Sequence, residues 1–200
     1  MSGGTVEEHA AALRAAVQAL KAPETATRAP APTTSVYGRA ARAVPDDVHP
    51  PATREVLAGR FRSVETSALL PGTAMALVVL PTRGAVPAEL LASMQQLVTT
   101  GARVVLLGPD MPRSVPPTGA HTLSEPATVP LRGDDALAQE WALVACGPQR
   151  RVAFIARREP GSADLWSWLV TRDAIAVQRA GTALLERVPF LRWRVPALSD

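Results

Sequence analysis

Continuous apolar runs and a helical pattern alternate between residues 73 and 107. Residues 73–80 (TAMALVVL) and 102–107 (ARVVLL) are mainly apolar, which predicts strands buried on both faces of a sheet. Between them, apolar residues recur at helical spacing from residue 87 to residue 98. A strand, a helix and a second strand joined by short links predict a βαβ unit, so we expect the two strands to be parallel.

Three further apolar runs predict antiparallel strands near the C-terminus. Residues 141–146 (WALVAC) and 152–156 (VAFIA) flank a short polar connection of hairpin length, and residues 165–171 (LWSWLVT) follow a second turn. Residues 172–187 then show an apolar stripe with helical period. We therefore expect the α/β class, as a single domain whose mixed parallel and antiparallel sheet is flanked by helices.

A narrow apolar stripe and a linker precede this domain. Residues 5–22 predict an amphipathic helix, and residues 23–50 are rich in Pro, Ala and Thr, so the domain is expected to span residues 51–200. The stripe suits either self-association into a homodimer or docking on the protein's own domain. Its apolar residues include Val6, Leu13, Val17 and Leu20.

The composition narrows the class of partner. The formal net charge is +3, but Lys21 is the only lysine and the twenty arginines are spread along the chain, which argues against a nucleic-acid partner. The N-terminus lacks the pattern of a signal peptide, and no apolar run is long enough to span a membrane. We expect a soluble, cytoplasmic protein without a membrane partner. Its single cysteine, Cys146, is expected to be a buried thiol.

Motifs for common catalytic chemistry are absent from the sequence. The three histidines are not spaced for a metal site or a catalytic triad, and no phosphate-binding loop or nucleophile elbow occurs, so we expect no metal and no cofactor. Asp134, Asp135 and Glu140 form one group of carboxylates. Asp134 and Asp135 precede a predicted helical turn and suit its N-cap, whereas the three together would suit the acid–base chemistry of a small enzyme.

Two pairs of residues are candidates for ligand binding. Ligands of α/β sheets bind beyond the carboxyl ends of the parallel strands, where Arg83 and Asp110 are predicted to lie. Trp166 and Trp168 are two apart on a predicted strand and therefore share a face. The two tryptophans would either stack a planar ligand or form part of the core.

The region from residue 134 to residue 188 resembles the C-terminal half of the DICT sensory domain, which is named for its occurrence in diguanylate cyclases and two-component systems. The matching segments are DDALAQEWALVACGP, VAFIARREPG and WSWLVTRDAIAVQRAGTALLERV. The family's Glu-Trp pair corresponds to Glu140 and Trp141, and its aspartate before the final helix corresponds to Asp173. A looser similarity extends back to residue 53.

This resemblance implies a non-catalytic sensory or regulatory binding module of bacterial signalling or transcriptional regulation. DICT domains are usually fused to an output domain, which this sequence does not show, so we expect the output to come through a partner. The ligand itself, a small molecule or a protein, is not identified by the sequence. One alternative is a degenerate phospholipase-D-like sensor domain, whose H-x-K motif is missing here. A small α/β enzyme that uses the loop carboxylates is another.

Overall fold

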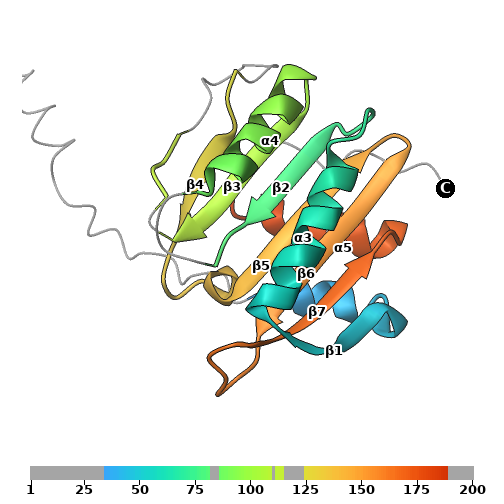
Figure 1. Ribbon diagram of the computed structural model, residues 1–200, viewed down its shortest axis with the longest axis vertical. Helices are drawn as coiled ribbons and strands as arrows, with labels where there is room; N and C mark the ends of the chain where they lie inside the picture. The colour runs from blue at the N-terminus through green and yellow to red at the C-terminus, as the bar shows by residue number, and fades with distance from the viewer. Residues whose placement is uncertain (1–33, 82–85, 110, 115–123, 189–200) are drawn as a thin grey trace, which may run out of the picture. The chain divides into compact units, whose positions relative to one another are not determined.

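A mixed β-sheet organises the fold. The structure is a computed structural model that describes residues 34–81, 86–109, 111–114 and 124–188, and Figure 1 shows their strands side by side in one sheet. The seven strands are β1 (Val48–Thr53), β2 (Met75–Val79), β3 (Arg103–Pro109), β4 (Ala127–Leu131), β5 (Glu140–Gly147), β6 (Arg150–Arg158) and β7 (Leu165–Thr171).

The sheet joins a parallel half to an antiparallel half. Its strand order is β1-β7-β6-β5-β2-β3-β4. Strands β2, β3 and β4 are parallel to one another, and α4 (Ala88–Thr99) connects β2 to β3. On its other side β2 pairs with β5 in antiparallel orientation, and β6, β7 and β1 continue that pattern. The predicted α/β class, the mixed sheet and the parallel pair are confirmed.

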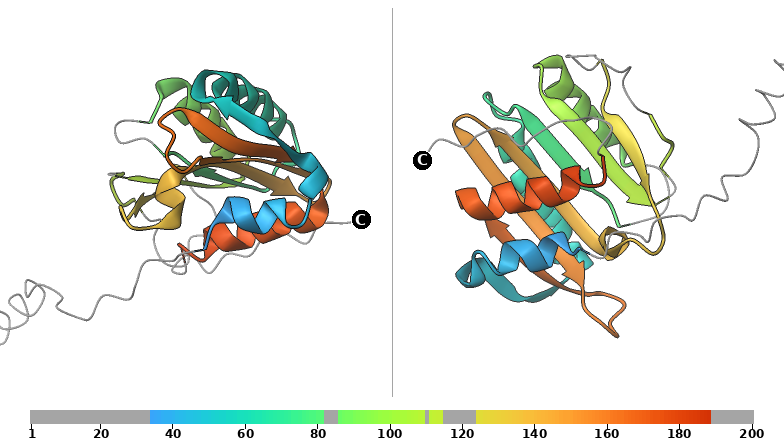
Figure 2. Two further views of the ribbon diagram at one scale, coloured as in Figure 1. Left: turned by 90° about the horizontal axis from the view of Figure 1, so that it is seen from below. Right: turned by 180° about the vertical axis from the view of Figure 1, so that it is seen from behind.

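Helices cover both faces of the sheet (Figure 2). Helices α3 (Arg54–Ala68) and α4 pack on one face, whereas α2 (Val36–Ala41) and α5 (Ala174–Leu185) pack on the other. Side chains of a strand point alternately to the two faces, so Leu77 of β2 belongs to the core under α5 and Val78 to the core under α3. Two separate apolar cores therefore stabilise one sheet.

The domain begins before residue 51, where the sequence pattern placed its start. The predicted linker, residues 23–50, includes α2, the short 3-10 helix η1 (Pro45–Asp47) and the first residues of β1. Helix α2 is part of the core, since Val36 and Ala40 are fully buried. The predicted helix over residues 5–22, with Val6, Leu13, Val17 and Leu20, lies outside the described residues.

The buried thiol expected from the composition is confirmed. Cys146 is buried on β5, and burial raises the pKa of its thiol to about 12. Within the described part of the chain, no helix combines the length and the apolarity that crossing a membrane requires.

Candidate functional site

The predicted tryptophan pair belongs to the core. Trp166 is only 1% exposed, and the guanidinium of Arg158 lies 5.2 Å from the centre of its ring. Trp168 stacks on His49 with ring centres 4.1 Å apart, and its indole N–H donates to the carbonyl oxygen of Pro50 at 3.0 Å. Both tryptophans therefore belong to the core, which was the second of the two roles considered for them, and Trp168 also attaches the edge strand β1 to β7. Arg83 and Asp110, the other predicted ligand residues, lie outside the described residues.

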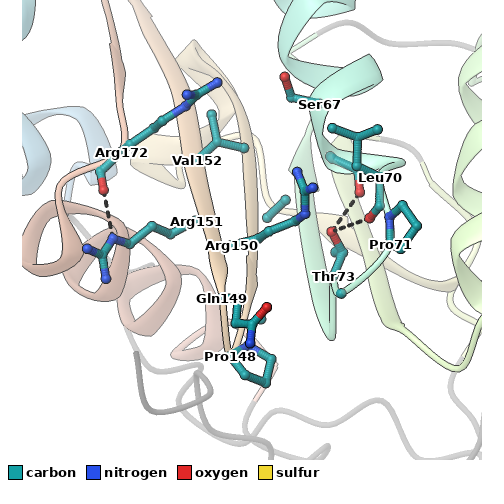
Figure 3. A pocket seen from close by; sticks show the side chains of 14 residues that line it. Ser67, Leu70, Pro71, Thr73, Pro148, Gln149, Arg150, Arg151, Val152 and Arg172 are labelled. Carbon is teal, nitrogen blue, oxygen red and sulfur yellow. Dashed lines mark hydrogen bonds between the residues drawn. The ribbon is translucent and has the colours of Figure 1, made fainter. Parts of the chain in front are cut away.

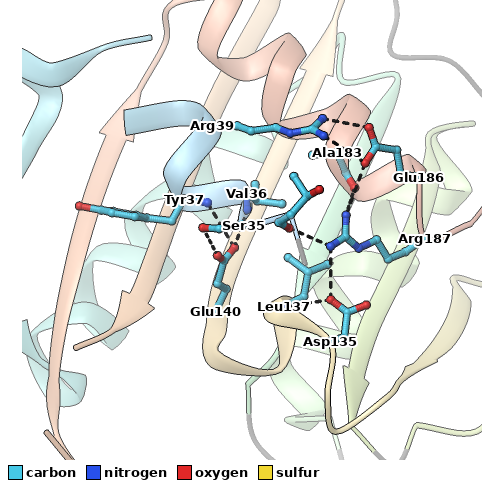
Figure 4. A network of polar contacts seen from close by, with 11 residues as sticks. Ser35, Val36, Tyr37, Arg39, Asp135, Leu137, Glu140, Ala183, Glu186 and Arg187 are labelled. Atoms are coloured by element: carbon cyan, nitrogen blue, oxygen red, sulfur yellow. Dashed lines mark hydrogen bonds and ion pairs between the residues drawn. The ribbon is translucent and has the colours of Figure 1, made fainter. Parts of the chain in front are cut away.

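Two of the three loop carboxylates are buried and act as caps (Figure 4). Asp135 caps the 3-10 helix η2 (Ala136–Gln139), because its Oδ1 accepts from the backbone N–H of Leu137 at 2.9 Å. The same oxygen lies 3.3 Å from the guanidinium of Arg187, which also donates to the carbonyl oxygen of Thr34. Asp134 is exposed and pairs with Arg132. Asp135 is therefore part of the interior, whereas Asp134 lies at the surface.

Glu140 caps a helix that lies more than a hundred residues earlier in the chain. Its carboxylate accepts from the hydroxyl of Ser35 at 2.5 Å and from the backbone N–H groups of Val36 and Tyr37 at 3.0 and 3.2 Å. Burial raises the pKa of Glu140, although these hydrogen bonds and the charge of Arg157 act in the opposite direction. We call this contact between Glu140 and residues 35–37 the latch.

Trp141 follows Glu140 on β5 but faces the opposite side of the sheet. Its ring stacks on Phe61 of α3 with centres 5.0 Å apart and meets the ring of Phe154 edge-on at 5.5 Å. The indole Nε1 is buried, with no hydrogen-bond partner within the described ranges. Asp173, the third residue of the family resemblance, caps α5 by accepting from the N–H of Ala176 at 2.8 Å. Glu140 and Asp173 thus cap helices, and Trp141 packs against Phe61 and Phe154. Trp141 also lines a cavity.

That cavity, here called the ring pocket, lies at the carboxyl end of β2. It has a volume of about 240 Å³ and opens between α3, the start of α4 and the start of β5. Its apolar lining consists of Ala58, Phe61, Leu80, Pro81, Pro87, Leu90 and Trp141.

Four charged side chains surround the ring pocket. Arg54, Arg62 and Glu65 come from α3, and Glu89 comes from the first turn of α4. No ion pair involving these four occurs between residues that the structure describes. Pro87, the N-cap residue of α4, forms no side-chain cap hydrogen bond, so within the described residues the first turn of α4 has no side-chain cap at this edge. An apolar base with polar groups at its rim is the usual composition of a small-molecule site.

The position of the ring pocket agrees with the rule used for the sequence, but its residues were not predicted. In the sequence, Phe61, Arg54 and Arg62 fit the pattern of an ordinary amphipathic helix. Such a pattern does not show which turn of the helix will lie over the end of a strand. The described residues contain no cluster of three or more side chains able to hold a metal ion. Comparisons with known proteins gave no match: no family model, no curated protein and no solved structure is similar to this chain.

Proposed function

We propose that the protein is a non-catalytic sensory or regulatory module that binds a small molecule in the ring pocket and signals through a partner. The observation that carries this proposal is the placement of two neighbouring residues of β5. Trp141 forms a wall of the pocket, and Glu140 holds the start of α2 on the opposite face. The start of β5 therefore contacts both the proposed ligand pocket and helix α2.

The ring pocket fits a ligand of one ring that carries a polar substituent. Its volume of about 240 Å³ is below the range of drug-sized sites, which begins at about 300 Å³. Phe61 and Trp141 offer aromatic surface to a planar group. Arg54 and Arg62 would attract a carboxylate, whereas Glu65 and Glu89 would attract an amine. The sign of the ligand's charge is therefore the first property to measure.

Two of the three loop carboxylates are poorly placed for acid–base catalysis. Asp135 and Glu140 are engaged by backbone N–H groups, and a general acid or base needs an oxygen that can reach a substrate. The resemblance to DICT domains favours the same class of function and a cytoplasmic location in a bacterium. A homodimer formed through residues 5–22 remains part of the proposal.

The indole N–H resonance of Trp141 offers a direct test. Benzoate, benzylamine and indole would be titrated into ¹⁵N-labelled protein, with Trp141→Phe used to assign the resonance. At least one probe is expected to shift it to saturation. Ala58→Leu, which fills the pocket, should abolish the shift, whereas Ser63→Leu on the exposed side of α3 should leave it unchanged. A resonance that responds to none of the three probes would contradict the ligand site.

The regulatory part of the proposal has its own readout. Hydrogen exchange of the backbone amides of Val36 and Tyr37 reports on the latch, because both donate to Glu140. A bound probe is expected to change their exchange rates. If a probe binds and these rates stay the same, the ligand site stands and signalling through the latch is refuted.

A further inference from the structure

A second cleft, the arginine cleft, lies at the opposite end of β2 from the ring pocket. Figure 3 shows the side chains that line it. Its volume is about 750 Å³. One wall is the end of α3 with the turn that leads into β2, residues 67–73. The other wall is the hairpin between β5 and β6, residues 147–152, and Arg172 extends this wall beyond β7.

The two walls are held together by backbone contact. A Cβ atom at Gly147 would collide with the carbonyl group of Gly72, so the hairpin and the turn touch at a point that only glycine allows. Next to this point, the N–H of Ala74 donates to the carbonyl oxygen of Cys146 at 2.9 Å. The cleft is thus a fixed feature of the sheet end.

Two guanidinium groups lie on the α3 side of the hairpin. Alternation along β6 puts Arg150 on the same face as Val152, whose side chain packs in the core under α3. In Figure 3 the guanidinium of Arg172 also lies on the Val152 side, whereas Arg151 extends away from it. Arg151 donates from its Nε to the carbonyl oxygen of Arg172 at 2.9 Å, which ties Arg172 to the hairpin.

The cleft carries positive charge without a compensating carboxylate. Among the residues that the structure describes, no aspartate or glutamate lines it. Arg150 and Arg172 are exposed, and neither forms an ion pair with a residue in the described segments. The C-terminal end of α3 carries the negative end of the helix dipole, which disfavours an anion at this wall. The hydroxyl of Thr73 donates to the carbonyl oxygen of Ala68 at 2.7 Å and so satisfies one acceptor at that end. Two charge-assisted hydrogen bonds outweigh the remaining helix dipole.

We propose that the arginine cleft binds a phosphorylated small molecule, with Arg150 and Arg172 holding the phosphate. Arginine matches the geometry of phosphate oxygens, and two arginines balance the charge of a phosphate dianion. The cleft is much larger than a phosphate, and Leu70, 44% exposed, with Pro148 provides apolar surface for an organic group. A nucleic acid would need positive charge along an extended track, whereas these arginines gather at one corner of the sheet.

Calorimetric titration of the full chain with adenosine monophosphate (AMP) tests this site. AMP is expected to bind at least tenfold more tightly than adenosine. Arg150→Gln and Arg172→Gln should each weaken AMP binding roughly tenfold or more, the value of one charge-assisted hydrogen bond. Arg179→Gln, which removes the same charge from an exposed position on α5, is the matched control and should have no effect.

Two further measurements distinguish binding in the arginine cleft from binding in the ring pocket and from general attraction of nucleic acid. Ala58→Leu fills the ring pocket and should leave AMP binding unchanged, so a loss in this variant would assign the nucleotide to the ring pocket and overturn the proposal. A short DNA duplex is the second probe. The proposal is also overturned if only the duplex binds, if adenosine binds as tightly as AMP, or if Arg179→Gln weakens AMP binding as much as Arg150→Gln does.

Discussion

Removal of the latch by Glu140→Ala is expected to release α2 from the sheet. The substitution takes away the acceptor of the Ser35 hydroxyl and of two backbone N–H groups, those of Val36 and Tyr37. Val36 is fully buried and Tyr37 is 6% exposed, so water does not readily replace the carboxylate. Helix α2 has six residues, too few for an isolated helix to be stable in water.

The magnitude follows from these three hydrogen bonds. A hydrogen bond to a charged group contributes about 1.5–3 kcal/mol, and a buried donor left without a partner costs about 1–3 kcal/mol. The values are not additive, and the alanine variant no longer has to bury a carboxylate, which offsets part of the loss. We expect the free energy of unfolding to fall by about 2–4 kcal/mol. Glu140→Gln keeps one acceptor oxygen and should lose about half as much.

Urea denaturation measures the global effect, and hydrogen exchange at residues 36–40 measures the local one. Glu186→Ala is the matched control, because it also removes a carboxylate that contacts α2, in the exposed pair with Arg39 at 2.9 Å. Such a surface pair contributes about 0–1 kcal/mol. Equal losses for Glu140→Ala and Glu186→Ala, or unchanged exchange at residues 36–40, would refute the assignment of Glu140 as the residue that holds α2.

Three other changes have definite expected outcomes. Because burial raises the pKa of Glu140, the folded state keeps a proton that the unfolded chain has lost, so stability should fall as the pH rises through the raised pKa. Denaturation of wild type and Glu140→Gln between about pH 4 and 8 would show this as a decline specific to the wild type. Gly147→Ala should cost more than about 2 kcal/mol in a thermal melt, because its Cβ meets backbone, whereas Gly133→Ala, with open space around it, should be neutral. Leu13→Asp should lower either the mass in solution or the melting temperature, and no change in either would contradict the predicted role of residues 5–22.

The strands that the sequence predicted are those that follow a simple apolar pattern. The residues of β2 are all apolar, and this composition alone indicates a strand buried on both faces of a sheet. In the structure every residue of β2 is buried. The edge strands β1 and β4 contain proline, at positions 50, 51 and 130, and were not predicted. Proline lacks the N–H that a central strand needs, but an edge strand pairs on one side only and tolerates the loss. Where β1 carries its prolines, its register with β7 shifts.

The latch was not predictable, because its two halves are far apart in the sequence. Asp135 caps a helix that begins at the next residue, so the local pattern was enough to suggest its role. Glu140 caps α2 across 103 to 105 residues, and no local rule identifies such a pair. The capping interpretation is confirmed for Asp135. It is wrong for Asp134, whose exposed carboxylate pairs with Arg132 instead. Only the structure shows which helix Glu140 caps.

If the proposed function holds, a ligand in the ring pocket would have to act on α2 through side chains, since β5 itself is held on both sides by hydrogen bonds to β2 and β6. The indole N–H of Trp141 is buried without a partner within the described residues, which costs free energy in the present arrangement. A ligand whose acceptor can reach this N–H only after the ring moves would favour the moved position. Glu140, the preceding residue, holds the short helix α2, whose release costs less than global unfolding. The free energy by which a ligand shifts the equilibrium between the latched and the released α2 cannot exceed the difference in its binding free energy for these two states. A ligand that binds both states almost equally will therefore bind without a signal.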